Sequence, residues 1–134
     1  TFGDHAEYRF NQTEGGVQYQ GIEVGWLPEG YELVRSRISD ETEQRCYVKS
    51  VNGTEQSIEI QVMDFAGEGI FKVDTEADEL YQVIVQNTLA TVIERGSRIQ
   101  ITWMHPKFNC IVMLYSDNIS AETALRIAQS IVLS

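Results

Sequence analysis

The sequence predicts an α+β fold in which a curved, mainly antiparallel, multi-stranded sheet is packed by one C-terminal α-helix. Three observations lead to this prediction. Most of the chain alternates apolar and polar residues with the period of two that a half-buried strand shows. Turn signals such as Asn52-Gly53 separate these runs. Only the stretch 120–133 carries its apolar residues at helical spacing.

The stretch 22–34 organises the prediction, because two extended runs flank a rigid corner at Leu27-Pro28-Glu29-Gly30. Pro28 fixes its own φ and keeps Leu27 out of the helical region. Gly30 supplies the positive φ that a tight turn often needs. Apolar residues alternate over 22–26 and again over 31–35, so we expect a strand on each side of the corner, each with one buried face.

Seven further strands follow from alternating or continuous apolar runs. The clearest hairpin joins 45–51 to 57–63, because Asn52-Gly53 suits a type I′ turn. The segment 110–115 is apolar throughout, which predicts a central strand covered on both faces. The other expected strands are 70–73, 80–85, 89–94 and 98–104.

The predicted helix runs from Ser120 to Leu133. Ser120 is a good N-cap, and Glu122 in the first turn complements the helix dipole. Burying Leu125 and Ile131 against the sheet should contribute about 1.5–3 kcal/mol each. The apolar stripe consists of Ala121, Ala124, Leu125, Ala128, Ile131 and Val132.

Length and charge restrict the class of protein. A chain of 134 residues forms one domain, which we place at 22–134 after a polar, partly ordered lead-in at 1–21. The net charge of −10 disfavours binding to nucleic acid and to anionic membranes. No run approaches the roughly 20 apolar residues of a membrane span. Because the chain opens without Met, we expect an ectodomain whose N-terminal membrane anchor lies outside this sequence.

The two cysteines, Cys46 and Cys110, leave two interpretations open. They could pair in an oxidising compartment, but the sequence does not place them within bridging distance. Each also lies in a predicted strand, where a free cysteine behaves as a small core residue.

A search for catalytic and metal-binding motifs returns none. The histidines are His5 and His105, and there is no Gly-x-Ser-x-Gly elbow. The acidic segment 74–79 offers oxygen ligands for a cation but lacks the glycine and glutamate positions of an EF-hand. Zinc motifs and phosphate-binding loops are absent. We therefore expect no catalytic residue, no metal and no cofactor.

Several motifs resemble the domain-of-unknown-function family numbered 4367. Leu27-Pro28-Glu29-Gly30-Tyr31 is similar to the opening motif of that family, and Ile101-Thr102-Trp103 is similar to its late strand. Asp74-Thr75-Glu76 resembles the acidic segment of that family, and the stretch 120–131 resembles the helix that closes it. Gln86-Asn87-Thr88 and Asp117-Asn118 depart from its usual turns. The resemblance implies a Gram-positive bacterial domain that follows a single membrane anchor, sometimes near anti-sigma-factor regions, with no established catalytic residues.

The lead hypothesis is a non-catalytic extracytoplasmic module that binds or senses an unknown protein or envelope ligand. Its recognition surface would include Trp26, Tyr31 and Trp103, although Trp26 and Tyr31 also fit as core residues. An exposed sheet edge would allow a homodimer by strand pairing. The alternative is a carrier of an apolar ligand in a cavity between sheet and helix. A hydrolase that uses acids from the turns is the third hypothesis.

Overall fold

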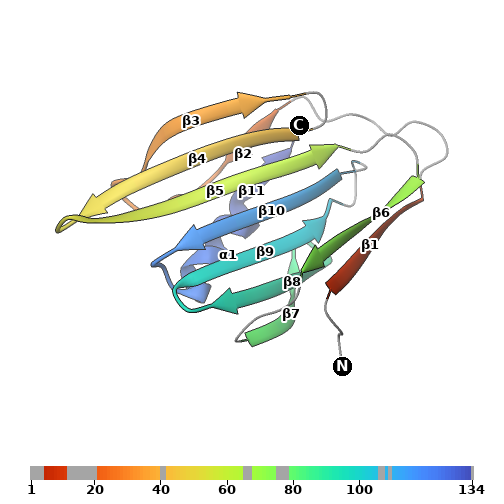
Figure 1. The fold of residues 1–134 in the computed structure, drawn as a ribbon. Coiled ribbons are helices and arrows are strands. Elements are labelled where there is room, and N and C mark those ends of the chain that lie inside the picture. The colour runs from red at the N-terminus through yellow and green to blue at the C-terminus, as the bar shows by residue number, and fades with distance from the viewer. Residues whose placement is uncertain are drawn as a thin grey trace.

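The computed structural model describes residues 5–11, 21–39, 42–64, 68–74, 79–105, 108 and 110–133. Its main element is a seven-stranded antiparallel sheet with one helix, α1 (Ala121–Ser130), behind one face (Figure 1). The predicted α+β fold is therefore confirmed. In spatial order the strands are β3 (Glu32–Ile38), β4 (Thr42–Val51), β5 (Thr54–Asp64), β10 (Cys110–Asp117), β9 (Arg98–Met104), β8 (Thr88–Arg95) and β7 (Glu79–Val85).

Two short antiparallel ladders accompany the main sheet. One joins β1 (His5–Asn11) to β6 (Glu68–Asp74), so part of the predicted lead-in is a strand. Residues 1–4 and 12–20 of that lead-in lie outside the described residues. The other ladder joins β2 (Ile22–Val24) to β11 (Ile131–Leu133) and connects the two ends of the predicted domain.

The helix is shorter than predicted. It begins after Ser120, whose hydroxyl accepts a hydrogen bond from the backbone N–H of Thr123 at 3.1 Å, as expected for an N-cap. It ends at Ser130, so the prediction of helix over the last three residues to Leu133 is wrong. The β-branched pair Ile131-Val132 favours extended backbone, and the ladder with β2 supplies the hydrogen-bond partners that a further helical turn would have used.

The main core lies between the sheet and α1. Ala124 and Ala128 are fully buried and Ile131 is 2% exposed, which confirms these positions of the predicted stripe. Leu125 is only half-buried, and Val132, also predicted to be buried, is 52% exposed. The small alanine side chains let α1 lie close to the strands beneath it. Facing them, the sheet contributes the buried side chains Ile58, Ile60, Val62, Ile99, Ile101, Trp103, Val112 and Leu114.

Strand β10 occupies the centre of the sheet and is covered on both faces, as its apolar sequence predicts. Val112 and Leu114 point into the main core. Ile111 and Met113 are buried on the opposite face, in a second cluster with Met63, Met104 and Tyr115 around them. The face opposite α1 is therefore apolar at one end of β10.

Strand β3 has no buried face, so the prediction of a half-buried strand after the corner is wrong there. All of its residues are exposed, including Leu33 at 51% and Val34 at 59%. The reason is the position of α1, which packs mainly on β7, β9 and β10, whereas β3 is the edge strand at the other side of the sheet. Before the corner, β2 ends at Val24, so Trp26, which the prediction placed in a strand, lies outside the observed strand.

The turns follow the predicted chemistry. Asn52 and Gly53 both have positive φ, 50° and 79°, which confirms a type I′ turn. Gln86 and Asn87 take similar φ values of 52° and 65° at the position where the sequence departs from the resembled family. Gly30 has a φ of 98°, as the corner requires.

Neither cysteine forms a disulfide. Cys46 is half-buried on the face opposite α1, whereas Cys110 is fully buried in the main core. The sheet therefore separates them, and the disulfide that the sequence left open is not formed. No helix among the described residues is long and apolar enough to cross a membrane.

Candidate functional site

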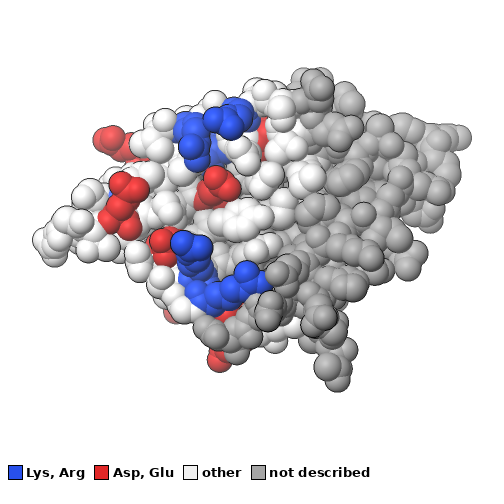
Figure 2. All heavy atoms as spheres, in the orientation of Figure 1, with Lys and Arg blue, Asp and Glu red and all other residues white. Residues whose placement is uncertain are grey.

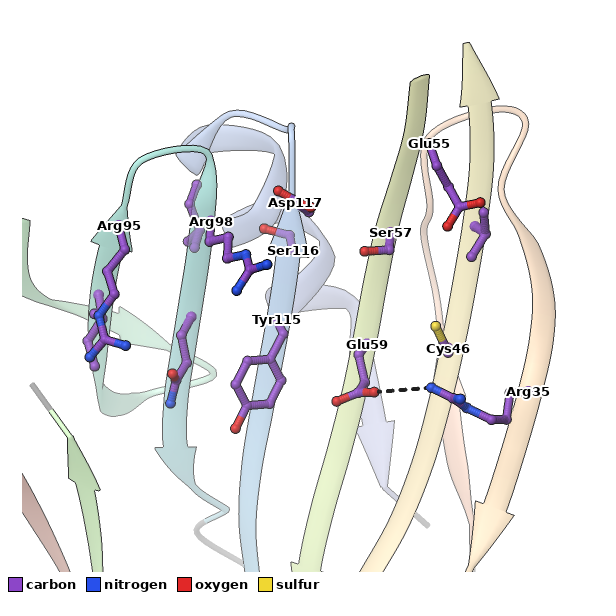
Figure 3. Close-up of a pocket in the computed structure, with 14 residues that line it drawn as sticks. Arg35, Cys46, Glu55, Ser57, Glu59, Arg95, Arg98, Tyr115, Ser116 and Asp117 are labelled. Atoms are coloured by element: carbon purple, nitrogen blue, oxygen red, sulfur yellow. Dashed lines mark ion pairs between the residues drawn. The ribbon is translucent and has the colours of Figure 1, made fainter. Parts of the chain in front are cut away.

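A charged groove lies on the face of the sheet opposite α1. Its volume is about 550 Å³, and side chains from β3, β4, β5, β8, β9 and β10 line it (Figure 3). Figure 2 shows this face with basic side chains in two groups and acidic side chains between them. The charged residues of the groove are Arg35, Glu55, Glu59, Arg95, Arg98 and Asp117.

Strand register aligns the middle of the groove. Glu59 of β5 is the cross-strand partner of Cys46 on one side and of Tyr115 on the other. The row continues outward to Arg35 of β3 and, in the other direction, to Gln100 of β9. Because alternate residues of a strand share one face, the whole row points away from α1. Sequence reasoning missed this group, since its members are far apart in the chain.

An ion pair occupies one end of this row. The Nη2 atom of Arg35 lies 3.8 Å from Oε1 of Glu59, and the two side chains are 57% and 30% exposed (Figure 3). A pair this exposed contributes at most about 1 kcal/mol to stability. Either partner can therefore exchange this contact for one with a ligand at low cost.

Hydrogen bonds hold the opposite end of the groove in place. Ser97, in the turn between β8 and β9, donates from its hydroxyl to Oδ1 of Asp117 at 3.0 Å. Its carbonyl accepts from the backbone N–H of Asn118 at 3.0 Å. The side-chain amide of Asn118 donates to the carbonyl of Glu55 at 3.5 Å. The β8–β9 turn is thus tied to the end of β10 and, more weakly, to the β4–β5 hairpin.

Two titratable groups of the groove, the Cys46 thiol and the Tyr115 phenol, favour their neutral forms. Burial raises the pKa of the Cys46 thiol, and Glu59 and Glu55 raise it further, although Arg35 lowers it. Burial, with a contribution from Glu59, also raises the pKa of the Tyr115 phenol. Cys46 therefore stays a thiol at neutral pH, and the thiol is a poor nucleophile. Tyr115 stays a phenol whose hydroxyl contacts the Met113 sulfur at 3.2 Å.

The groove lining, as far as the structure describes it, contains no histidine that could act as a base. His105 lies elsewhere, with its ring 5.2 Å from that of Phe108. The described residues also contain no group of three or more His, Cys, Asp or Glu side chains that could hold a metal. The acidic side chains at 74–78, considered above as cation ligands, lie outside the described residues.

The three aromatic residues predicted to form a recognition surface all belong to the main core or pack against it. Trp103 is fully buried in the main core, with its Nε1 unpaired among the described residues, and is unavailable to a partner. Trp26 is half-buried beneath Arg126, whose guanidinium carbon lies 3.9 Å from the ring centre. Tyr31 packs against the same core and donates to Oε1 of Gln56 at 3.2 Å. Recognition by Trp26 and Tyr31 stays a prediction.

An open antiparallel sheet with one helix on one face and a charged groove on the other defines an α+β domain whose candidate site lies on the sheet surface. Residues 21–131 match the model of a family described as "Domain of unknown function (DUF4367)", and the chain belongs to this family. Neither a curated protein nor a solved structure matches the chain.

Proposed function

We propose that this domain is a non-catalytic binding module that takes its ligand in the groove on the open face of the sheet. The observation that carries the proposal is the convergence of charged and polar side chains from six strands on one concave surface. Side chains on strands keep their positions better than side chains on loops, and such preorganisation favours binding.

Size and polarity support a small ligand or a short segment of a larger one. A volume of about 550 Å³ lies within the range of roughly 300–1,000 Å³ that small-molecule sites occupy. The groove offers guanidinium donors, carboxylate acceptors and the Tyr115 phenol, while Val48 and Ile93 supply apolar contact. This combination suits recognition of a ligand with both charged and apolar parts.

The neutral thiol of Cys46 favours a binding function over a catalytic one. A nucleophilic mechanism requires a thiolate or hydroxyl activated by a neighbouring base. The pKa of Cys46 is raised, because burial together with Glu59 and Glu55 outweighs the opposite effect of Arg35. We therefore assign Cys46 to the wall of the groove and give it no catalytic role.

The biological setting that we propose is the outer side of the bacterial membrane. The resemblance described above implies a Gram-positive protein in which this domain follows a membrane anchor and is linked to regulation. In that setting, occupancy of the groove by a protein or envelope ligand would be the sensed signal. The exposed edge strand β3 is where strand pairing with a second copy would occur.

The carrier of an apolar ligand stays an untested prediction. The region between α1 and the sheet contains fully buried side chains, among them Ala124, Ile127 and Ala128 of the helix and Ile101 and Leu114 of the sheet. A ligand would have to displace this packing. No contact in the described residues favours that interpretation over the groove.

Fragment binding tests the proposal. We would screen the ¹⁵N-labelled domain by NMR against a library of anionic, cationic, zwitterionic and neutral fragments. Ser57 lies in the groove wall on β5, so Ser57→Trp should fill the site, whereas Val132→Trp adds the same side chain at an exposed position of β11. We expect fragments that bind the wild type and Val132→Trp but not Ser57→Trp. Absence of any fragment that Ser57→Trp blocks would overturn the proposal.

A further inference from the structure

We infer that the end of the groove at the β8–β9 turn is an oxyanion-binding subsite, in which Arg95 and Arg98 hold a carboxylate or phosphate group of the ligand. The inference rests on the proposed function, because it names the chemistry of the ligand that occupies the same groove. Its basis is that Arg95 and Arg98 are cross-strand partners on β8 and β9. Among the described residues, no carboxylate forms an ion pair with Arg98.

Arg95 and Arg98 are direct cross-strand partners that flank the two-residue turn Gly96-Ser97. Gly96 has a φ of 59°, which lets the turn close tightly between them. Both arginines line the groove, and Figure 3 shows Arg98 extending from β9 toward β10. Like charges directly opposite each other in a sheet repel, so this arrangement favours an anion between or beside the two guanidinium groups.

Among the described residues, the carboxylate on the neighbouring strand forms no ion pair with Arg98. Asp117 is the cross-strand partner of Arg98 on β10, yet its Oδ1 atom accepts a hydrogen bond from the hydroxyl of Ser97. Within the described part of the chain, the Arg98 side chain forms neither an ion pair nor a hydrogen bond. Glu59, the next carboxylate along the groove, is already paired with Arg35. Arg98 therefore presents its donors to the groove.

The chemistry of guanidinium selects the class of ligand. Its planar fork of N–H donors matches the oxygens of a carboxylate or a phosphate, and charge-assisted bonds of this kind are about twice as strong as neutral ones. Because the protein carries a net charge of −10, long-range electrostatics repel anions. Retention of an anion on this face therefore requires a local site such as the Arg95–Arg98 pair.

The remaining charges restrict the ligand further. Glu55 and Glu59 line the groove on β5, away from the arginine pair. These carboxylates would repel a second anionic group, so a polyanion does not fit. The ligand that matches this pattern carries one oxyanion at one end and an uncharged or cationic part toward β5.

Titration with simple anions tests the subsite. We would add inorganic phosphate, and separately acetate, to the ¹⁵N-labelled domain with sodium chloride at matched ionic strength, and follow the amides of Gly96 and Ser97. We expect a saturable shift that Arg98→Gln or Arg95→Gln weakens at least tenfold, which corresponds to about 1.4 kcal/mol. Arg37→Gln removes the same charge from exposed β3, outside the groove lining, and should bind as the wild type does. Saturation by phosphate alone or by acetate alone identifies the oxyanion.

Two results would overturn the subsite. One is a linear shift equal to that of sodium chloride, and the other is equal weakening in Arg98→Gln and Arg37→Gln. Thermal unfolding of each variant checks the fold, and we expect Arg98→Gln to melt at or above the wild-type temperature. Neutral or cationic fragments that Ser57→Trp still blocks would then show that only the oxyanion subsite fails. If no fragment of any charge binds, the proposed function fails as well.

Discussion

Gln86 and Gln129 join the turn between β7 and β8 to the end of α1. The backbone N–H of Gln86 donates to Oε1 of Gln129 at 3.0 Å, while Nε2 of Gln129 donates to the carbonyl of Ile84 at 2.9 Å. The side-chain amide of Gln86 also donates to the carbonyls of Ala128 and Ile131. The carbonyl of Ala128 thus accepts the Gln86 amide as well as the backbone N–H of Ile131. Polar contacts thus fix α1 to the sheet in addition to the core.

Removing this connection should weaken the fold measurably. Gln129→Ala eliminates two hydrogen bonds between α1 and the β7–β8 region. At roughly 0.5–1.5 kcal/mol for each bond, we expect the free energy of unfolding to fall by about 1–3 kcal/mol in urea denaturation. Gln82→Ala, at an exposed position of β7, is the matched control. Equal stability of the two variants would contradict the role given to Gln129.

Gly25 should tolerate no side chain. A Cβ atom at this position would lie 2.9 Å from the carbonyl oxygen of Ser130, which also accepts the Gly25 N–H at 2.9 Å. Because the obstructing atom is backbone at the end of α1, relief requires separating β2 from β11. We expect Gly25→Ala to lower the free energy of unfolding by about 1–3 kcal/mol. Glu23→Ala, at an exposed position of β2, should change it little, and similar values for both would refute the steric argument.

The repulsion between Arg95 and Arg98 should appear in stability without any ligand. Arg98→Gln removes one of two like charges that face each other across β8 and β9. We expect this change to raise the free energy of unfolding by about 0.2–1 kcal/mol at low salt. The gain should shrink as salt screens the charges. A loss of stability relative to Arg37→Gln would mean that Arg98 has a stabilising partner.

Tyr81 should make the protein less stable in alkali. Burial first, and then the 2.7 Å hydrogen bond from its hydroxyl to Oε2 of Glu94, raise the pKa of Tyr81 to about 12. Between pH 10 and about 12 the unfolded chain loses a phenolic proton that the folded chain keeps, so stability falls as the pH rises through this window. Below it, the contribution of Tyr81 is constant.

The difference in tyrosinate absorbance between the wild type and Tyr81→Phe measures this titration directly. We expect a midpoint near pH 12, and a lower midpoint in the Glu94→Gln background. Tyr115→Phe controls for the general loss of one phenol. A Tyr81 midpoint near that of free tyrosine, at about pH 10, would contradict the assigned environment.

Much of the fold could be predicted from local sequence. Period-two alternation and Asn52-Gly53 identify β4 and β5 with their turn, and an unbroken apolar run identifies β10 as the central strand. The end of α1 could not be predicted in the same way. Ile131–Leu133 leaves the helix because a distant segment, β2, pairs with it.

The candidate site was less accessible to sequence reasoning. Its side chains come from six strands, and only the strand order and register place Arg35, Glu59 and Tyr115 in one row. The aromatic character of a residue does not tell whether it lies in the core or on the surface. Trp103, predicted as part of a recognition surface, is fully buried. One local signal was present in the pair of arginines around Gly96-Ser97, because residues that flank a two-residue turn must face each other.

The central claim is that ligands bind on the open face of the sheet. The most direct measurement is an amide and side-chain chemical-shift map of the ¹⁵N,¹³C-labelled domain saturated with the tightest fragment. We expect shifts centred on Glu59, Gln100 and Tyr115, which line the groove, with the methyl groups of Ile60 and Leu114 unchanged because they face α1. Shifts centred on those methyl groups and on α1, with a silent groove, would contradict it and favour an apolar ligand between helix and sheet.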